Sequence, residues 1–160
     1  MALKTSPAAL LGGNGTLPPG HGVEDNSARS IDLDPDTCMQ LIAPGGVGRV
    51  VFVDADVPIA LPVNFGVLGG DVVFRTGGFT SIATGALERR ISFEVDRIDD
   101  AFAEGWSVLI RGAAHEVSEP AQREAIEELG VRPWVGGARE TYFCLEPEHI
   151  TGRKIVSTTG

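Results

Sequence analysis

The sequence is poor in cysteine and has no long apolar run. Its two cysteines, Cys38 and Cys144, are too few for a disulfide framework, so the simpler interpretation is two small buried thiols in a reducing compartment. No apolar run approaches the roughly 20 residues of a membrane span. We therefore expect a soluble, cytoplasmic protein with no membrane partner.

Basic residues are also scarce relative to acidic ones. Lys and Arg number 13 against 22 Asp and Glu, which gives a formal net charge of −9. A nucleic-acid groove needs a basic surface that displaces counterions from the phosphates. The composition therefore excludes nucleic acid as the expected partner. It also means that a phosphorylated ligand would need a local basic site rather than the overall field of the protein.

Several familiar site motifs are missing. The glycine-rich stretch 45–49 is not followed by Lys and Ser or Thr, so it is no phosphate-binding loop. The glycines of 12–15 precede no strand–helix unit, which excludes a dinucleotide-binding fingerprint. The three histidines fit no metal-ligand spacing, so we expect no metal site; they are His21, His115 and His149.

The chain divides into a tail and one domain. Residues 1–30 are rich in Gly, Pro, Ser and Asn with little periodicity, which predicts a flexible N-terminal tail. The folded domain is expected to cover 31–160. It opens with Asp34 and Pro35, a carboxylate cap followed by a residue whose φ is already helical. The sequence after residue 43, Pro-Gly-Gly, predicts the end of that helix.

Period-two alternation of apolar residues dominates the rest of the domain. It predicts strands around 49–53, 59–67, 72–74, 91–96, 106–111 and 142–145, with a hairpin turn at Gly69 and Gly70. Short turns between successive strands favour antiparallel pairing, and such a sheet hides its edges best by closing into a barrel. Two short helices are expected, one near 80–86 and one that starts at Ser118 and ends at Gly130.

One segment combines groups that suit an anion. Arg75 and Thr76 end a strand, and Thr80 and Ser81 open a short helix. A guanidinium, hydroxyls and free backbone N–H groups at a helix start could together bind a phosphate. Spacing alone favours a simpler interpretation, in which Arg75 lies in water and Thr80 caps the helix.

The two tryptophans are the second feature of interest. The broad rings of Trp106 and Trp134 could lie against a flat aromatic ligand. Composition alone favours packing in the core or in a subunit interface instead.

The order of several short segments resembles a known family. Pro62-Val63-Asn64-Phe65 is followed by the segments 73–76, 93–96, 105–112, 132–134 and 150–155. This ordered set resembles the pyridoxamine 5'-phosphate oxidase-like proteins, especially the short flavin-binding members from bacteria. The resemblance covers roughly Asp34 to Val156. It implies a mainly β fold, a six-stranded antiparallel split β-barrel with a few short peripheral helices.

The resemblance also implies a cofactor and a partner. Family members are homodimers with two FMN sites in the interface, each built from both subunits. Carried over by position, one group of residues would lie along the flavin ring and a second would approach the phosphate. The ring group is Val63, Asn64 and Trp106, with Trp134 as a weaker match that reaches the partner's site; the phosphate group is Arg75, Thr76, Thr80 and Ser81.

One departure from the family pattern bears on the cofactor. Relatives commonly carry a Lys beside the position of Ser81, and this chain has none there. The loss of one charge-assisted bond lowers affinity by about 1.5–3 kcal/mol, roughly tenfold to a hundredfold. The alternatives that remain open are weak FMN binding, a deazaflavin coenzyme, or no cofactor.

The leading hypothesis is an FMN-binding oxidoreductase that transfers a hydride to or from a small substrate. The sequence names neither the substrate nor a general acid or base. Two rival hypotheses are a non-catalytic module that binds or sequesters flavin and a cofactor-free structural dimer.

Overall fold

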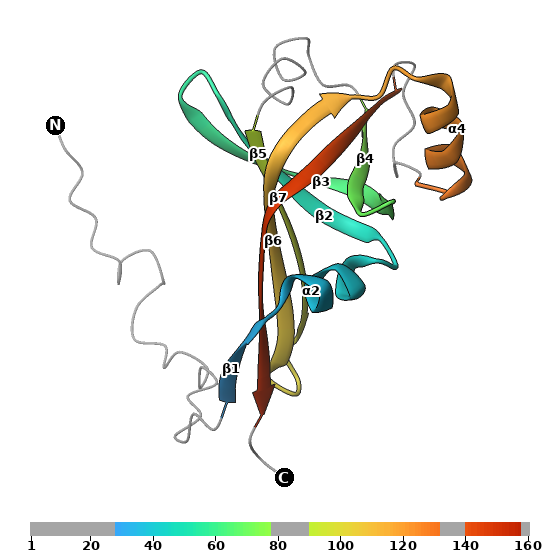
Figure 1. The fold of residues 1–160 in the computed structure, drawn as a ribbon. Helices are drawn as coiled ribbons and strands as arrows, with labels where there is room; N and C mark the ends of the chain where they lie inside the picture. Colours follow the sequence, from blue (N-terminus) through green and yellow to red (C-terminus); the bar gives the residue numbers. More distant parts are fainter. Residues whose placement is uncertain (1–27, 78–89, 132–139, 158–160) are drawn as a thin grey trace, which may run out of the picture.

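The structure is a computed structural model that describes residues 28–77, 90–131 and 140–157. It is mainly β, as predicted, and every pair of neighbouring strands is antiparallel (Figure 1). The strands are β1 (Ala28–Leu33), β2 (Gly46–Asp54), β3 (Val57–Leu68), β4 (Asp71–Gly77), β5 (Arg90–Asp99), β6 (Glu104–Glu116) and β7 (Glu140–Ser157). The helices are α2 (Pro35–Ile42) and α4 (Pro120–Glu128).

The strands close into a ring. Their order in the sheet is β1-β7-β4-β3-β2-β5-β6, and an additional pairing of β6 with β7 joins six of them into a barrel. β7 pairs along one edge with β4 in its first part and with β1 in its last part. This arrangement confirms the predicted six-stranded barrel and adds β1 as a seventh strand. The last three residues of the predicted tail, 28–30, belong to β1.

Two hairpin turns follow from local sequence. Gly69 and Gly70 have φ of 64° and 99° between β3 and β4, the left-handed region that mirror-type hairpin turns require. Ala55 and Asp56 also have positive φ, at 46° and 68°, between β2 and β3. The first turn was predicted from its glycines, whereas Ala55 adopts a conformation that a residue with a Cβ rarely takes.

The helices begin and end close to the expected residues. Asp34 caps α2 by accepting hydrogen bonds from the backbone N–H and the hydroxyl of Thr37, at 2.9 and 2.7 Å. These bonds lower the pKa of the Asp34 carboxyl. α4 starts at Pro120, two residues after the predicted Ser118, and Gly130 follows it with a φ of 69°. The predicted helix at 80–86 lies outside the described residues.

The barrel core is built around phenylalanines. The ring centroid of Phe74 lies 5.6 Å from that of Phe93 and 5.7 Å from that of Phe143, and both pairs are stacked. Phe65 meets Phe93 edge-to-face at 5.3 Å. Strand alternation sends all four rings to the inside of the barrel, and α2 adds Ile42 to the same core.

Both cysteines are buried and free, as expected. Cys38 belongs to the barrel core, and Cys144 packs in a smaller cluster under α4. Burial, followed by the nearby Asp71 carboxylate, raises the pKa of the Cys144 thiol to about 12. The thiol is therefore protonated at neutral pH and behaves as a small apolar side chain.

Two absences hold for the described part of the chain. None of its helices is long and apolar enough to cross a membrane. Within the same ranges, no three residues among His, Cys, Asp and Glu come together in a way that could hold a metal ion.

The stacked rings lead to a stability prediction. We expect Phe74→Ala to lower the free energy of unfolding by about 3–5 kcal/mol, because it leaves a cavity between two rings that cannot move together in a closed barrel. Val53→Ala is the matched control: that side chain is 58% exposed, and its loss should change the free energy by no more than about 0.5 kcal/mol. Urea unfolding measures both, and equal costs would contradict the proposed core.

Candidate functional site

Strand alternation separates the predicted site residues of β4 onto two faces. Val72, Phe74 and Thr76 point into the barrel, and Thr76 is only 4% exposed. Val73 and Arg75 point outward, and Val73 belongs to the cluster under α4. Arg75 therefore lies on the outer face of the barrel, whereas the Thr76 side chain belongs to the interior.

Arg75 is held on that face by an aromatic ring. It is paired in register with Tyr142 of β7, and its guanidinium carbon lies 5.2 Å from the centroid of the Tyr142 ring. A second guanidinium, that of Arg123 on α4, lies 5.8 Å from the same ring. Both distances are within the range of a cation–π contact. Two positive charges thus share one ring on the outer face of an acidic protein.

α4 holds Arg123 in place by packing on the barrel. Ile126 on α4 is fully buried against Val73 and Tyr142. Arg123 lies three residues before Ile126, a spacing that puts both on the same side of the helix. The cluster therefore fixes the distance between the two guanidiniums by packing two elements that are far apart in sequence.

Asn64 lies beside Arg75 on the same outer face. β3 pairs with β4 through Phe65 and Phe74, and Asn64 and Arg75 are the next residues of the two strands. Asn64 is partly exposed and lines a pocket of about 220 Å³ together with Gly45, Gly66 and Val131. Asn64 thus borders this cavity while it lies opposite Arg75 on the neighbouring strand.

Val63 differs from Asn64 in the face it occupies. It is only 7% exposed and belongs to the barrel core. A ligand on the outer face could meet its backbone but not its side chain.

Trp106 lies far from Arg75 within one chain. It is partly buried against the core near the other end of the barrel, and it is paired in register with Lys154 of β7. Lys154 is twelve residues from Tyr142, which is about 40 Å along an extended strand. The structure therefore does not bring Trp106 and Arg75 into one site in a single chain. Thr80, Ser81 and Trp134 lie outside the described residues.

Sequence reasoning missed Tyr142 and Arg123. Tyr142 was assigned only to a strand, and nothing in its alternation marks which residue it faces on the neighbouring strand. Arg123 did carry a weak signal, because it is the one basic residue of the acidic helix Pro120–Glu128. Only the packing of α4 on β4 and β7 brings Arg123 into contact with Tyr142.

Comparison with known proteins places this fold in a family. Residues 34–154 match the sequence profile of the family described as pyridoxamine 5'-phosphate oxidase. The chain belongs to this family. The match spans almost the whole range over which the sequence itself showed the resemblance, from the cap of α2 to β7.

Individual relatives of the family share most of their length with the chain. An uncharacterised protein of Mycobacterium tuberculosis, Rv0080, is 37% identical over 137 residues, which cover 82% of this chain and 90% of the relative. A solved structure described as the FAD-binding protein from Mycobacterium smegmatis is 29% identical, with a TM-score of 0.66, and 78% of this chain and 98% of that one are covered. A conserved protein of unknown function from Corynebacterium diphtheriae is 28% identical, with a TM-score of 0.67 over 79% and 98%.

The sequence has no Lys beside Ser81, where other members of the pyridoxamine 5'-phosphate oxidase family commonly carry one. The Arg75–Tyr142–Arg123 cluster contains a positive charge from another part of the chain. Arg123 supplies a second positive charge next to Arg75 from a different element. Two cationic groups, one from β4 and one from α4, thus lie on the same tyrosine ring, although the sequence has no Lys beside Ser81.

We predict that Tyr142 couples the two arginines to the barrel. Tyr142→Leu should lower the free energy of unfolding by about 1–3 kcal/mol, because it removes the ring under both guanidiniums. Tyr142→Phe keeps the ring and should cost less than about 1 kcal/mol. A double-mutant cycle with Arg75→Gln should give a coupling energy of about 0.5–2 kcal/mol for Tyr142→Leu and close to none for Tyr142→Phe. A cycle without coupling would show that the ring does not hold Arg75.

Proposed function

We propose that the protein binds a flavin nucleotide, with FMN as the first candidate, and that the outer face of β3, β4 and β7 holds its phosphate end. The observation that carries this proposal is the pair of guanidiniums on the Tyr142 ring in a protein of net charge −9. Membership of the pyridoxamine 5'-phosphate oxidase family supports the same cofactor class.

The groups on this face suit a phosphate in their chemistry. A guanidinium can donate two parallel hydrogen bonds to phosphate oxygens and stays charged at any physiological pH. The ring under Arg75 limits the directions that its side chain can take, so less freedom is lost when a ligand binds. Arg123 would supply the charge that the missing Lys supplies in relatives. The amide of Asn64 would lie toward the flavin ring, and the backbone of Val63 beside it.

A bound flavin would supply hydride transfer. The chain itself would orient the cofactor through the two arginines and Asn64 and would shield one side of it with α4. A flavin-dependent oxidoreductase is therefore the activity that we propose. A non-catalytic flavin-binding module remains its rival, because none of the described residues of this face stands out as a general acid or base.

FAD is a second candidate cofactor. A relative that is 29% identical, with 98% of its length covered, is described as the FAD-binding protein of M. smegmatis. The pyrophosphate of FAD distributes its negative charge over two phosphate groups, and each of these could meet one of the two guanidiniums. The dissociation constants of FMN and FAD, measured under the same conditions, decide between the two cofactors.

We further propose that the protein is a homodimer. Trp106 could join a ligand at Arg75 only if it came from a second subunit, since the two are far apart in one chain. Ile98 and Ile155 flank Gly105 on neighbouring strands at the same end of the barrel as Trp106, and they are 68% and 46% exposed. Phe102, in the adjacent turn, is 70% exposed. Such a group of exposed apolar side chains supports a subunit contact.

The flavin proposal predicts a titration result. FMN should bind with a dissociation constant in the micromolar range, seen as saturable quenching of its fluorescence, and riboflavin should bind roughly tenfold more weakly because it lacks the phosphate. Arg75→Gln and Arg123→Gln should each weaken FMN about tenfold and leave riboflavin unchanged. FAD and a deazaflavin coenzyme are titrated in parallel.

The matched control is Arg111→Gln, an exposed arginine of β6 on a different part of the outer surface, which should not change FMN binding. Equal affinity for FMN and riboflavin would place the phosphate elsewhere. A protein that binds none of the nucleotides at near-millimolar concentration would leave the cofactor-free structural dimer as the better hypothesis.

The dimer proposal has its own test. Ile155→Lys should shift the protein from dimer to monomer in light scattering at micromolar concentration, because a charge within the apolar group cannot be buried without a partner. Val57→Lys, at the start of β3 and at a side chain of 58% exposure, should leave the mass unchanged. A wild-type protein of monomer mass would refute the proposal, and Trp106 would then have no route to the flavin.

A further inference from the structure

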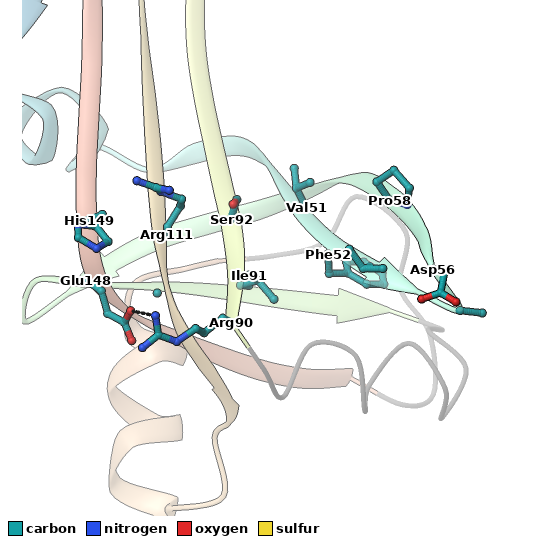
Figure 2. Close-up of a pocket in the computed structure, with 13 residues that line it drawn as sticks. Val51, Phe52, Asp56, Pro58, Arg90, Ile91, Ser92, Arg111, Glu148 and His149 are labelled. Carbon is teal, nitrogen blue, oxygen red and sulfur yellow. Dashed lines mark ion pairs between the residues drawn. The ribbon is translucent and has the colours of Figure 1, made fainter.

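A second candidate site lies on a different part of the outer surface. A pocket of about 670 Å³ opens between the hairpin of β2 and β3 and the strands β5, β6 and β7 (Figure 2). This volume is in the range of small-molecule sites, roughly 300–1,000 Å³. Arg111, on its floor, is five residues from Trp106 along β6, which is about 16 Å, and His149 is seven residues from Tyr142 along β7, about 23 Å.

Three polar side chains form a row across the pocket. Ser92 of β5, Arg111 of β6 and His149 of β7 are paired in register, so each lies next to the following one at the strand spacing of about 4.8 Å. Figure 2 shows them side by side on neighbouring strands. All three point away from the core, since Phe93, Ile110 and Ile150 on either side of them pack inward.

A β-bulge adds a fourth polar side chain to this row. The register between β6 and β7 shifts between Arg111, opposite His149, and Gly112, opposite Pro147. Glu148 is therefore the extra residue of β7, and both Glu148 and His149 face outward although they are consecutive. Only glycine fits at position 112, because a Cβ there would overlap the carbonyl oxygen of Glu146. A bulge of this kind commonly re-aims side chains beside a functional site.

Only some of the charged side chains in the pocket form ion pairs with one another. Arg90 and Glu148 form an ion pair of 2.9 Å, drawn as a dashed line in Figure 2, and so neutralise each other. Among the residues that the structure describes, neither Arg111 nor His149 makes an ion pair with a carboxylate. Asp56 also lines the pocket, in the turn between β2 and β3, and within the described residues it makes no ion pair with either group. In a protein with 22 acidic residues against 13 basic ones, an arginine next to a histidine, neither of them paired with a carboxylate, suits an external anion.

The opposite wall of the pocket is apolar. Val51 continues the row of Ser92 onto β2, and Pro58 lines the side toward the hairpin turn. The Phe52 side chain belongs to the barrel core and is only 4% exposed, so a ligand with an anionic head at Arg111 would place its body against the aliphatic side chains of Val51 and Pro58. A bare inorganic ion would leave this wall without contacts.

We infer that this pocket binds a small organic anion, whose carboxylate or phosphate meets Arg111 and His149 and whose apolar body lies against Val51 and Pro58. The site is separate from the face of Arg75 and does not depend on flavin binding. Arg111 is a binding residue in this site, and the bulge residue Glu148 opposes the anion while it holds Arg90.

The test is a ¹⁹F NMR titration of the full-length protein with 4-fluorobenzoate and 4-fluorophenyl phosphate, and with the neutral 4-fluorobenzamide. Both anions should bind saturably in the millimolar range, and the amide should not. The tighter of the two anions identifies the head group. Arg111→Gln should weaken both about tenfold or more. Glu148→Gln should strengthen both about two- to fivefold, because it removes the nearby negative charge and frees Arg90.

Arg97→Gln, an exposed arginine of β5 that does not line the pocket, is the matched control and should change nothing. Thermal unfolding checks that each variant is folded. The proposal is overturned if neither anion binds up to tens of millimolar, if the amide binds as well as benzoate, or if Arg111→Gln and Arg97→Gln behave alike.

Competition separates this site from the flavin proposal. Saturating FMN should leave the affinity for fluorobenzoate unchanged, and Arg111→Gln should leave FMN binding unchanged. Displacement of the probe by FMN would mean that the pocket belongs to the flavin site, and the separate site would be wrong. A protein that binds the anions but no flavin would support this inference while the proposed cofactor fails.

Discussion

The pairing of β6 with β7 is the constraint on which the rest of this structure depends. It runs from Gly105 to Glu116 and turns an open sheet into a ring, so that the phenylalanines of four strands face one another inside. The close approach of the two strands at Gly112 leaves no room for a side chain. The closed ring in turn fixes which residues face outward, and among the described residues these include Arg75, Asn64, Arg111 and His149.

β7 links the functional features because it takes part in each of them. Near its start, Tyr142 carries the two guanidiniums of Arg75 and Arg123. In its middle, the bulge at Glu148 aims consecutive side chains into the larger pocket. Near its end, Lys154 is paired with Trp106. One long strand therefore spaces three surface regions along the barrel, and their separation follows from the rise per residue of an extended chain.

The flavin site that we propose would need a second copy of the barrel to be complete. The outer face of a barrel is convex, so residues at its two ends diverge instead of enclosing a ligand. Arg75 and Trp106 illustrate this, because both face a ligand in the family pattern and yet lie at opposite ends of β7. A second subunit would supply the missing wall, and the exposed Ile98, Phe102 and Ile155 lie where such a contact would be made.

The sequence alone determined the elements that are stabilised by interactions between residues close together in the chain. The Asp34–Pro35 helix start, the Gly69–Gly70 hairpin and the alternating strands were all predictable, because capping, positive φ and period-two burial act within a few residues. The family and the barrel class followed from the order of these pieces. The seventh strand β1 was missed, since its six residues are largely exposed and only two of them, Ile31 and Leu33, form an apolar alternation.

The tertiary structure decided the candidate sites. Arg75 and Thr76 are neighbours in sequence, but the pleat sends one outward and the other into the core, and the same holds for Asn64 and Val63. Tyr142, Arg123 and the row from Ser92 to His149 become functional candidates only through contacts between distant segments. A local pattern fixes the conformation of each strand, whereas the register between strands and the packing of α4 depend on the whole closed barrel.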